Sequence, residues 1–313
     1  MDAGGVLPYA LSPSAATSVE ARIIVAKPPA GRLYVVATPI GNLGDLSDRA
    51  RRTLESAAVI AAEDTRHSAP LLRHFGIAKP LVSLHEHNEL ERAPGLVARL
   101  AAGEDVALIS DAGTPAISDP GYALVRAAAA AGCEVIAVPG PCAAIAALSI
   151  AGLPTDRFAF EGFLPARAAA RRRRLAAVAD DSRTLVLYES PHRLGEMLGD
   201  CVTVLGAQRS AAVARELTKM HERVHRGRLD ELASLAAQDP DLARGEAVVV
   251  IEGAAPREES AGAAELDRLL EPLLAELPLA QAARLAARIS GLRDNEVYRR
   301  ALALRAAGSE EPH

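Results

Sequence analysis

Four polar side chains in the second half of the chain are candidates for acid–base chemistry. Glu189 and His192 follow one predicted strand, and Glu216 and Lys219 follow another. Carboxylate and imidazole groups accept protons from weakly acidic hydroxyls, and an ammonium group stabilises the negative charge that then develops. Because such groups also serve structural or ligand-binding roles in loops, both readings stay open for each of the four.

A second candidate group lies in a loop rich in Gly, Pro and Asp, residues 111–120. This loop follows the apolar run 106–110, and an amphipathic stretch and a second apolar run, 133–138, separate it from the turn at 139–141. The order predicts a strand, loop, helix and strand of a parallel sheet. Ligands of open parallel sheets bind beyond the carboxyl ends of the strands, so we expect both loops to face one ligand.

The loop after the first predicted strand lacks the motifs that hold phosphates. Residues 38–45 contain Gly41 and Gly44 with Pro39 in the turn, so the GxGxxG pattern of dinucleotide-binding proteins is absent, and so is the Walker pattern. The phosphates of a dinucleotide or a nucleoside triphosphate would therefore lack the glycine-rich loop that usually binds them. The absence of these motifs favours a nucleoside ligand without phosphates and argues against a nicotinamide-dependent dehydrogenase.

The composition indicates a globular protein with more than one core. The chain has 313 residues, half of them apolar, with five Tyr, four Phe and no Trp. A net charge of −5 gives no overall attraction to nucleic acid or anionic membranes. Cys133, Cys142 and Cys201 lie among apolar residues, so buried thiols are expected. Since no apolar run is long enough to span a bilayer and the start lacks a leader pattern, we expect a cytoplasmic protein with no membrane partner.

The elements that must position these residues alternate between strands and helices, which predicts an α/β protein. In the first half, strands are expected at 32–37, 59–62, 80–84, 106–110 and 133–138, with helices at 45–58, 65–75, 89–102 and 142–151 besides the amphipathic one named above. In the second half, strands are expected at 157–161, 184–189, 211–216 and 247–252, with helices at 168–178, 192–204 and 229–238. Gly152-Leu153-Pro154 marks the expected boundary between the two halves.

Four segments follow from this pattern. Residues 1–30 are expected to be a disordered extension, 31–152 an N-terminal α/β domain, 153–255 a C-terminal α/β domain, and 263–313 a small helical tail. The tail has three predicted helices, at 263–277, 279–290 and 294–306, with Gly291 in the last turn. This spacing is that of a helix-turn-helix, although a small helical bundle without a ligand fits equally well.

Eight motifs in register carry a resemblance to a known family. They are VATPIGNLGDLSDRA (36–50), AAEDTRHS (61–68), SDAGTPAISDPG (110–121), PGPCAAIAAL (139–148), EGFLP (161–165), YESPHR (188–193), ARELTK (214–219) and GEAVVVIEG (245–253). From about residue 31 to 305 the chain resembles the ribosomal RNA small-subunit methyltransferase I family of the tetrapyrrole-methylase superfamily. The departures from the family pattern are residues 1–30 and Met220-His221-Glu222, and the resemblance implies no role for the latter segment.

The resemblance implies a fold, a reaction and partners. The cofactor would be S-adenosyl-L-methionine, held in the cleft between two α/β domains of an enzyme that usually forms a homodimer. The reaction would be 2′-O-methylation of the ribose of a cytidine in the decoding region of 16S rRNA. The substrate would be 16S rRNA or the 30S subunit.

Expected cofactor contacts come from both walls of that cleft. Ala112 and Gly113 have almost no side chain and allow main-chain approach, while Asp111 or Asp119 can accept hydrogen bonds from ribose or ammonium groups. Asp119 could equally set a turn, and Tyr188 could be a core aromatic residue. The expected set is Pro39, Gly41, Ser110, Asp111, Ala112, Gly113, Asp119, Pro139, Gly140, Leu187, Tyr188 and Ala247.

Methyl transfer from a sulfonium to a hydroxyl neutralises charge in the transition state. A carboxylate at the sulfur would stabilise the ground state more than the transition state, so neutral carbonyl groups are expected there. Most of the rate enhancement should come from in-line positioning of the hydroxyl and the methyl group. A ribose hydroxyl ionises too little at neutral pH, so a base or a cation should help. The candidates are Glu189, Lys219, Glu216 and His192.

Basic residues beside the EGFLP turn are the expected RNA contacts: Arg167, Arg171, Arg172, Arg173, Arg174 and Arg193, to which the tail adds Arg284, Arg288, Arg293, Arg299 and Arg300. A solvated helix face is the other reading of such a run, but the neighbouring cleft favours phosphate contact. His85 and His87 lack a third ligand, so no metal is expected. A small-molecule, tetrapyrrole-like methylase and a non-catalytic RNA-binding or assembly protein are the alternatives.

Overall fold

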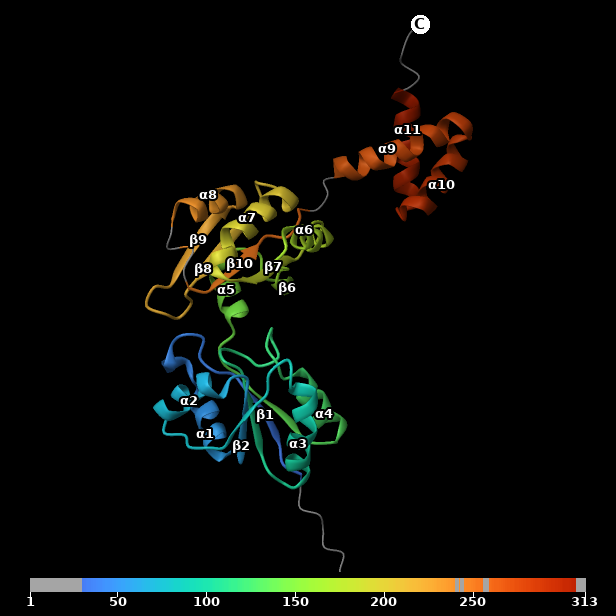
Figure 1. Cartoon of the computed structure of the whole chain (residues 1–313). Coiled ribbons are helices and arrows are strands. Elements are labelled where there is room, and N and C mark those ends of the chain that lie inside the picture. The colour runs from blue at the N-terminus through green and yellow to red at the C-terminus, as the bar shows by residue number, and fades with distance from the viewer. Residues whose placement is uncertain (1–29, 240–241, 243–244, 256–258, 308–313) are drawn as a thin grey trace, which may run out of the picture.

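The computed structural model describes residues 30–239, 242, 245–255 and 259–307. Within them two five-stranded sheets form two α/β lobes, and three helices form a separate C-terminal bundle. Figure 1 shows one lobe above the other, with the bundle to one side. The expected extension at 1–30 lies outside the described residues, except for residue 30.

The first lobe is a parallel sheet between helices. Its strands are β1 (Leu33–Val36), β2 (Val59–Ala62), β3 (Leu81–Ser83), β4 (Val106–Ile109) and β5 (Val135–Val138), and its helices are α1 (Asp48–Ser56), α2 (Thr65–His74), α3 (Glu89–Ala101) and α4 (Tyr122–Ala130). The strand order is β3-β2-β4-β1-β5, and every pairing is parallel. Because helices cover both faces, all residues of β2 and β4 are buried, which explains their continuous apolar runs.

Hydrogen bonds hold together the loops at the carboxyl ends of these strands. Thr38 and Gly113 exchange main-chain hydrogen bonds of 2.8 and 3.1 Å, which join the loops after β1 and β4. The main-chain N–H of Asp64, after β2, donates to Asp111 Oδ1 at 3.0 Å. Glu89 Oε1 accepts from the N–H groups of Gly121 and Ala123, so a carboxylate caps α4. The loop 110–121 is therefore fixed at both ends.

The second lobe is built on a mixed sheet. Its strands are β6 (Phe158–Phe163), β7 (Thr184–Glu189), β8 (Ser210–Arg215), β9 (Arg223–Arg228) and β10 (Ala247–Ile251), and its helices are α6 (Ala168–Ala177), α7 (Pro191–Leu205) and α8 (Leu229–Gln238). The order is β6-β7-β10-β8-β9, parallel between β6 and β7 and antiparallel elsewhere. The sequence analysis missed β9 because its RVHRGR has no apolar alternation, which an edge strand can tolerate.

Helix α5 (Ala143–Ala151) packs on the second sheet, although it precedes the predicted boundary at 152. Ala144, Ala147 and Leu148 share a core with strands β7, β8 and β10. Arg226 of β9 donates to the carbonyl oxygens of Ile150 and Ala151 at the end of the helix. The change from the first lobe to the second therefore occurs before α5, because the small residues of this helix fit the face of the second sheet.

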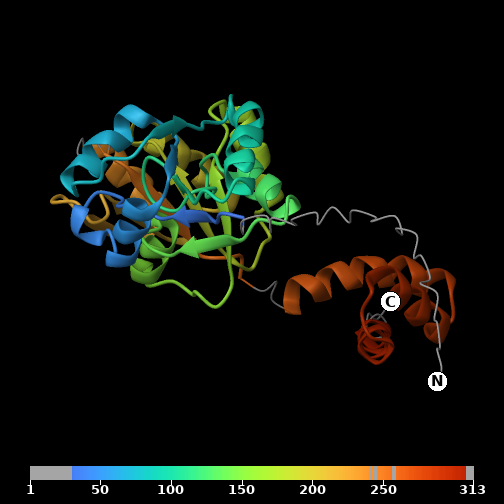
Figure 2. The same cartoon turned by 90° about the horizontal axis from the view of Figure 1, so that it is seen from below.

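The C-terminal bundle consists of α9 (Glu259–Glu276), α10 (Leu279–Ser290) and α11 (Asp294–Ala307). Its core includes Leu270, Ala286 and Val297, and an ion pair of 2.5 Å joins Arg300 to Asp267. The bundle lies apart from both lobes in two perpendicular views (Figures 1 and 2). No helix among the described residues is long and apolar enough to cross a membrane.

Candidate cofactor and substrate site

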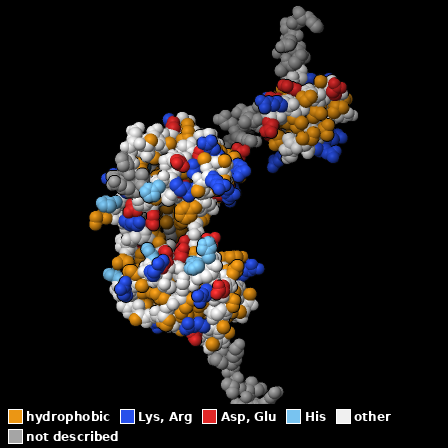
Figure 3. Space-filling view, in the orientation of Figure 1, with side chains coloured by type: hydrophobic (Ala, Val, Ile, Leu, Met, Phe, Trp, Pro, Cys, Tyr) orange, Lys and Arg blue, Asp and Glu red, His pale blue; other side chains and the backbone are white. Residues whose placement is uncertain are grey.

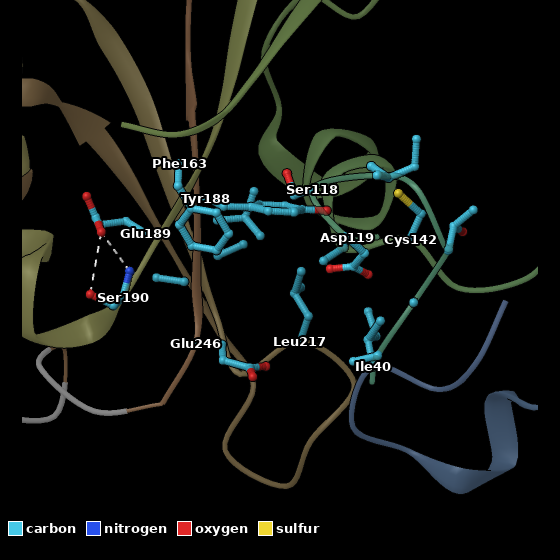
Figure 4. Close-up of a pocket in the computed structure, with 18 of the residues that line it drawn as sticks. Ile40, Ser118, Asp119, Cys142, Phe163, Tyr188, Glu189, Ser190, Leu217 and Glu246 are labelled. Carbon is cyan, nitrogen blue, oxygen red and sulfur yellow. Dashed lines mark hydrogen bonds between the residues drawn. The ribbon is translucent and has the colours of Figure 1, made fainter. Parts of the chain in front are cut away.

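A cavity of about 330 Å³, here called the first cavity, lies between the two lobes. Figure 3 shows the molecule hollowed between them. Ala112–Thr114 and residues 117–119 of the loop after β4 form one wall, and Tyr188, Glu189 and Val248 of the second lobe lie on the other. In Figure 4 Ile40 and Asp119 approach the cavity from the first lobe, and Phe163, Tyr188 and Leu217 from the second.

The two loops that border this cavity carry unusual backbone conformations. Among the described residues, the non-glycine residues with positive φ are Ala116 (67°), Ser118 (64°), Glu216 (52°) and Thr218 (65°). The first two lie in the loop after β4, and the other two in the loop after β8. Such conformations cost energy and gather at ligand sites, where the surrounding structure enforces them. Their placement on both sides of this cleft is typical of a functional site.

Asp119 places a carboxyl group at the cavity wall. Burial raises the pKa of Asp119 to about 6, and the nearby Glu63 and Asp111 carboxyls add to the shift, while a hydrogen bond with Ser110 opposes it. A carboxyl group that is partly removed from water in this way interacts favourably with a cationic or hydroxyl-bearing ligand. It is therefore suited to hold a ribose or an ammonium group.

Tyr188 lines the cavity with its ring, which its neighbours hold in place. The ring packs edge-on against Phe160 and Phe163, with centroids 5.0 and 5.5 Å away. The Tyr188 hydroxyl accepts a hydrogen bond of 3.1 Å from the main-chain N–H of Ala144 at the start of α5. Burial raises the pKa of this hydroxyl well above its ordinary value, so the phenol stays neutral. A fixed aromatic face suits a planar base.

Glu189 lies at the end of β7 and lines the same cavity, with 2% of its surface exposed. Its carboxylate accepts a hydrogen bond of 2.8 Å from the N–H of Ser190 and forms an ion pair of 3.3 Å with Arg193. Arg193 also donates to the carbonyl oxygen of Leu164 at 2.8 Å. The pair therefore fixes the turn from β7 into α7 at the edge of the cavity.

Lys219 reaches across from the second lobe to the first. Its Nζ lies 3.0 Å from Glu216 Oε1 and 3.1 Å from Glu246 Oε2. A Cβ atom at Gly41 would come within 2.4 Å of Lys219 Cγ, so only glycine allows this approach. Burial lowers the pKa of Lys219, but the hydrogen bonds to Glu216 and Glu246 outweigh it and raise the pKa above its ordinary value. The side chain is therefore a permanent cation.

A second cavity of about 640 Å³ adjoins the first and shares Ile40, Ala112 and Glu246 with it. Its other lining residues come from the loop after β1, from α2, and from Asp111 and Lys219. A group bound in the second cavity would therefore lie against a ligand of the first. This arrangement suits a donor in one cavity and an acceptor in the other.

The expected cofactor residues divide between these places. Those in the first cavity are Ala112, Gly113, Asp119, Tyr188 and Ala247. Those in the second are Pro39, Gly41, Asp111 and again Ala112. Ser110, Pro139, Gly140 and Leu187 line neither cavity.

The surroundings of these last four residues correct the prediction that they contact the cofactor. Leu187 is fully buried in the core of the second lobe because it points to the opposite face of β7 from Tyr188. A Cβ atom at Gly140 would lie 3.0 Å from that of Ala37, so this glycine serves packing, and Pro139 beside it is exposed. Ser110 is buried and acts through its hydrogen bond to Asp119.

The catalytic candidates are only partly brought together. Glu189 lines the first cavity and Lys219 the second, whereas Glu216 and His192 line neither. Glu216 accepts from the N–H of Glu246 at 2.9 Å and from Lys219. Burial raises its pKa, but these hydrogen bonds outweigh that and lower it, so Glu216 is a positioning group and a poor base. His192 is an exposed residue in the first turn of α7.

One of the expected RNA contacts is excluded by burial. Arg171 is 2% exposed and forms an ion pair of 2.6 Å with Asp200, so it belongs to the interior of the second lobe. Arg167, Arg172, Arg173 and Arg174 are exposed, although Arg172 pairs with Asp200 and Arg174 with Glu161. Figure 3 shows basic side chains gathered on the side of this lobe that carries α6. The exposed four form the remaining basic patch.

Sequence reasoning missed several lining residues. Ile40, Cys142, Ala143, Phe163 and Leu217 line the first cavity, and Arg66, His67 and Ser68 the second. Apolar lining residues resemble core residues in a sequence, so they gave no signal. Arg66, His67 and Ser68 lie within the motif AAEDTRHS, directly after a buried strand, and that position offered a signal.

The first cavity fits the methyl donor that the resemblance implies. Its volume is at the lower end of the range for ligand sites, and its walls are largely apolar with a few convergent polar groups. Gly113, with φ of 84°, keeps its main chain close to Ile40, where a side chain would crowd the space. Asp119 would hold the ribose or ammonium group, and Tyr188 the base. None of these residues forms a phosphate cradle.

Comparison with known proteins agrees with this geometry. Residues 32–233 match the family model of Tetrapyrrole (Corrin/Porphyrin) Methylases, and residues 260–305 match that of the RsmI C-terminal HTH domain. Ribosomal RNA small subunit methyltransferase I of Pseudomonas aeruginosa is 58% identical over 274 residues, which are 87% of this chain and 97% of the relative. Its namesake from Escherichia coli O157:H7 is 52% identical over 87% of this chain and 95% of the relative.

Solved structures share the fold at lower identity. The methyltransferase CobJ superimposes with a TM-score of 0.55 at 22% identity, over 73% of this chain and 97% of the other. Diphthine synthase gives 0.55 at 17% identity, over 71% of this chain and 90% of the other. The matched models and the two full-length relatives lead to one assignment: the chain belongs to the ribosomal RNA small subunit methyltransferase I family of tetrapyrrole methylases.

Proposed function

We propose that the protein transfers a methyl group from S-adenosyl-L-methionine to the ribose 2′-oxygen of a cytidine in the decoding region of 16S rRNA. The observation that supports this most is the pair of adjoining cavities, one with Asp119 and Tyr188 on its walls and the other with Lys219. The curated relatives at 58% and 52% identity bear the name of small-subunit rRNA methyltransferases. The position and the 2′-oxygen are proposed from the family resemblance.

The donor supplies an electrophilic methyl group on a sulfonium, and the protein provides position. Ile40, Ala143 and Val248 give the first cavity apolar walls, which would limit the access of water to a bound donor. The two cavities meet at Ala112, whose small side chain leaves the path between donor and acceptor open. In-line placement of the two reactants is expected to supply most of the rate.

Lys219 is the proposed electrostatic partner of the acceptor hydroxyl. Because its pKa is raised, it stays protonated and stabilises the oxygen anion that forms as the hydroxyl loses its proton. Glu216 and Glu246 hold the ammonium group in place. The proton itself passes to water, since Glu189, the other candidate base, lines only the first cavity and is paired with Arg193.

The proposed partners are 16S rRNA in the 30S subunit and a second copy of the chain. The exposed arginines of α6 would contact RNA phosphates, and the family resemblance supports a homodimer in the cytoplasm. Light scattering during size-exclusion chromatography gives the oligomeric state directly. A monomer at micromolar concentration would remove the homodimer from the proposal.

Labelled methyl transfer tests the substrate class. The protein and S-adenosylmethionine with a labelled methyl group are incubated with one of three substrates in parallel. These are 30S particles and free 16S rRNA that both lack the 2′-O-methyl group, and a porphyrinoid. We expect label in RNA, recovered after nuclease digestion as 2′-O-methylcytidine. Label in the porphyrinoid alone would establish a small-molecule methylase, and label in a base-methylated nucleoside would contradict the ribose assignment.

A further inference from the structure

The second cavity contains an unpaired polar atom that points to a ligand. Ser68 lies in α2 and is 3% exposed, and its Oγ has no hydrogen-bond partner in the described part of the chain. Ser68 also lines the second cavity. Buried hydroxyls are nearly always hydrogen-bonded, so an unpaired one on a cavity wall indicates a partner that is bound during function.

This hydroxyl lies in the first turn of a ten-residue helix. α2 begins at Thr65, and its N-cap residue, Asp64, accepts a hydrogen bond of 2.8 Å from the N–H of Arg66. The Asp64 carboxylate already accepts from main-chain N–H groups of this turn, so an incoming anion would meet the side-chain donors of the turn. Ser68 lines the second cavity beside them.

Two further side chains of that turn can donate hydrogen bonds to an anion. Arg66 lines the cavity, its side chain is 90% exposed, and it forms an ion pair of 2.8 Å with Asp64. His67 lines the cavity beside it and is exposed. Asp64 offsets part of the charge of Arg66, but the remaining guanidinium donors stay available to an incoming phosphate.

The wall shared with the first cavity has a different character. Ala112 and Glu246 lie on it, and Lys219 Nζ is 3.1 Å from Glu246 Oε2. Asp111 follows directly on this wall, and its Oδ1 accepts a hydrogen bond from the N–H of Asp64 at the start of α2. Carboxylates accept hydrogen bonds from sugar hydroxyls. The cavity therefore offers side-chain donors on α2 for a phosphate and carboxylates beside the shared wall for a ribose.

We propose that the second cavity holds the acceptor ribonucleotide and that the first turn of α2 anchors its backbone phosphate through Ser68 Oγ, Arg66 and His67. The anchor would orient the ribose so that one hydroxyl meets Lys219 and the shared wall. This inference rests on the proposed function, because it assigns the acceptor side of that reaction.

Binding of cytidine 5′-monophosphate tests the anchor without catalysis. The protein is saturated with S-adenosylhomocysteine, and NMR titration compares the nucleotide with cytidine, which lacks the phosphate. We expect the nucleotide to bind roughly tenfold more tightly, the usual effect of charge-assisted hydrogen bonds. Equal affinities would overturn the phosphate anchor.

Ser68→Ala separates a ligand role from a structural one. Since Ser68 Oγ has no partner to lose, the variant should unfold at the parental temperature or above while its affinity for cytidine 5′-monophosphate falls. Ser234→Ala, on α8 and outside both cavities, is the control. A lower unfolding temperature with parental nucleotide affinity would make Ser68 structural and overturn the proposal.

Arg66→Gln tests the anchor with RNA, and Arg73→Gln on the same helix is its control because Arg73 lines neither cavity. We expect Arg66→Gln alone to raise KM for 30S particles and, because the ribose is less well oriented, to lower kcat, while the affinity for S-adenosylhomocysteine stays parental. Parental KM with an active enzyme would overturn the anchor but leave the proposed function intact. A parent protein that methylates no RNA, yet binds cytidine 5′-monophosphate through Ser68, would overturn the proposed function but support the anchor.

Discussion

At the scale of single residues, the site holds two ionisable groups in opposite electrostatic situations. Asp119 is a partly buried carboxyl group with a raised pKa, which costs stability when it ionises, whereas Lys219 is a cation that two carboxylates stabilise. Contact with a cationic or hydroxyl-bearing ligand would offset the cost at Asp119. Residues kept in such states for binding should be distinguishable from structural residues by the pH dependence of the protein's stability and activity.

Asp119→Asn should stabilise the protein at neutral pH. The folded-state pKa of about 6 lies above the ordinary value, so the unfolded chain releases this proton first as pH rises, and folding loses stability between about pH 4 and 6. Asparagine removes that loss. The gain in unfolding temperature over the parent should grow from pH 4 to pH 6 and stay level above it, and thermal unfolding across pH measures it. A gain that does not change with pH would contradict the assignment.

Lys219→Met should lower the single-turnover rate by roughly 10²-fold at every pH, with parental binding of S-adenosylhomocysteine. Because Lys219 is charged at all working pH values, the shape of the pH profile should not change. Methionine keeps the unbranched stem that passes Gly41. Lys79→Met, whose side chain is outside both cavities, is the control. A pH profile altered by the loss of Lys219 would identify it instead as the general base.

At the scale of elements, α6 places its arginines in two environments. Arg171 points into the lobe and meets Asp200 of α7, while Arg167, Arg172 and Arg173 are on the exposed side. A run of four arginines in a sequence does not reveal which of them faces inward, since that depends on the crossing of α6 and α7. The cluster was therefore predicted as a unit, and one member had to be corrected.

Arg171→Gln should lower the free energy of unfolding by about 3 kcal/mol, the lower end of the range for breaking a buried ion pair, because Asp200 keeps Arg172. Arg173→Gln, on the exposed side, should change it by less than about 0.5 kcal/mol. Urea unfolding of the parent protein and both variants measures these differences in the free energy of unfolding. Equal stability of the two would place Arg171 at the surface.

Much of the fold was predictable from the sequence. The alternation of strands and helices gave both α/β lobes, and the α/β class is confirmed. β9 was missed because RVHRGR shows no alternation, and α5 was assigned to the wrong lobe because its small residues fit either sheet. Loop residues with Gly and Asp signalled the first cavity, whereas Ile40 and Leu217 are lining residues only through tertiary packing.

At the scale of the whole molecule, two lobes, one basic patch and a helical bundle must act on a large RNA. The net charge of −5 gives no general attraction to RNA, so the affinity must come from local patches. The exposed arginines of α6 and those of the C-terminal bundle, Arg284, Arg288 and Arg299, are the candidates. They lie on parts of the molecule that Figure 1 shows well separated, which suits a particle better than a short RNA.

Replacing Arg167, Arg172 and Arg173 together with Gln should weaken RNA binding and flatten its dependence on salt. Each phosphate contact that is lost lowers the log–log slope by roughly 0.7 to 0.9. The affinity for S-adenosylhomocysteine should stay parental because these residues do not line the first cavity. Filter binding to 16S rRNA at several salt concentrations measures the slope, and a parental slope would assign these arginines to a solvated face.

The first cavity, between the lobes, is the proposed site of the methyl donor. Calorimetric titration of S-adenosylhomocysteine into Ala143→Leu tests it most directly, because Ala143 lines this cavity and a larger side chain would occupy part of it. Ala129→Leu, at an exposed position of α4, is the control. We expect an affinity loss of about tenfold or more for Ala143→Leu, as overpacking typically costs 1–3 kcal/mol, and parental affinity for the control. Parental affinity in both variants would place the donor elsewhere and contradict the account.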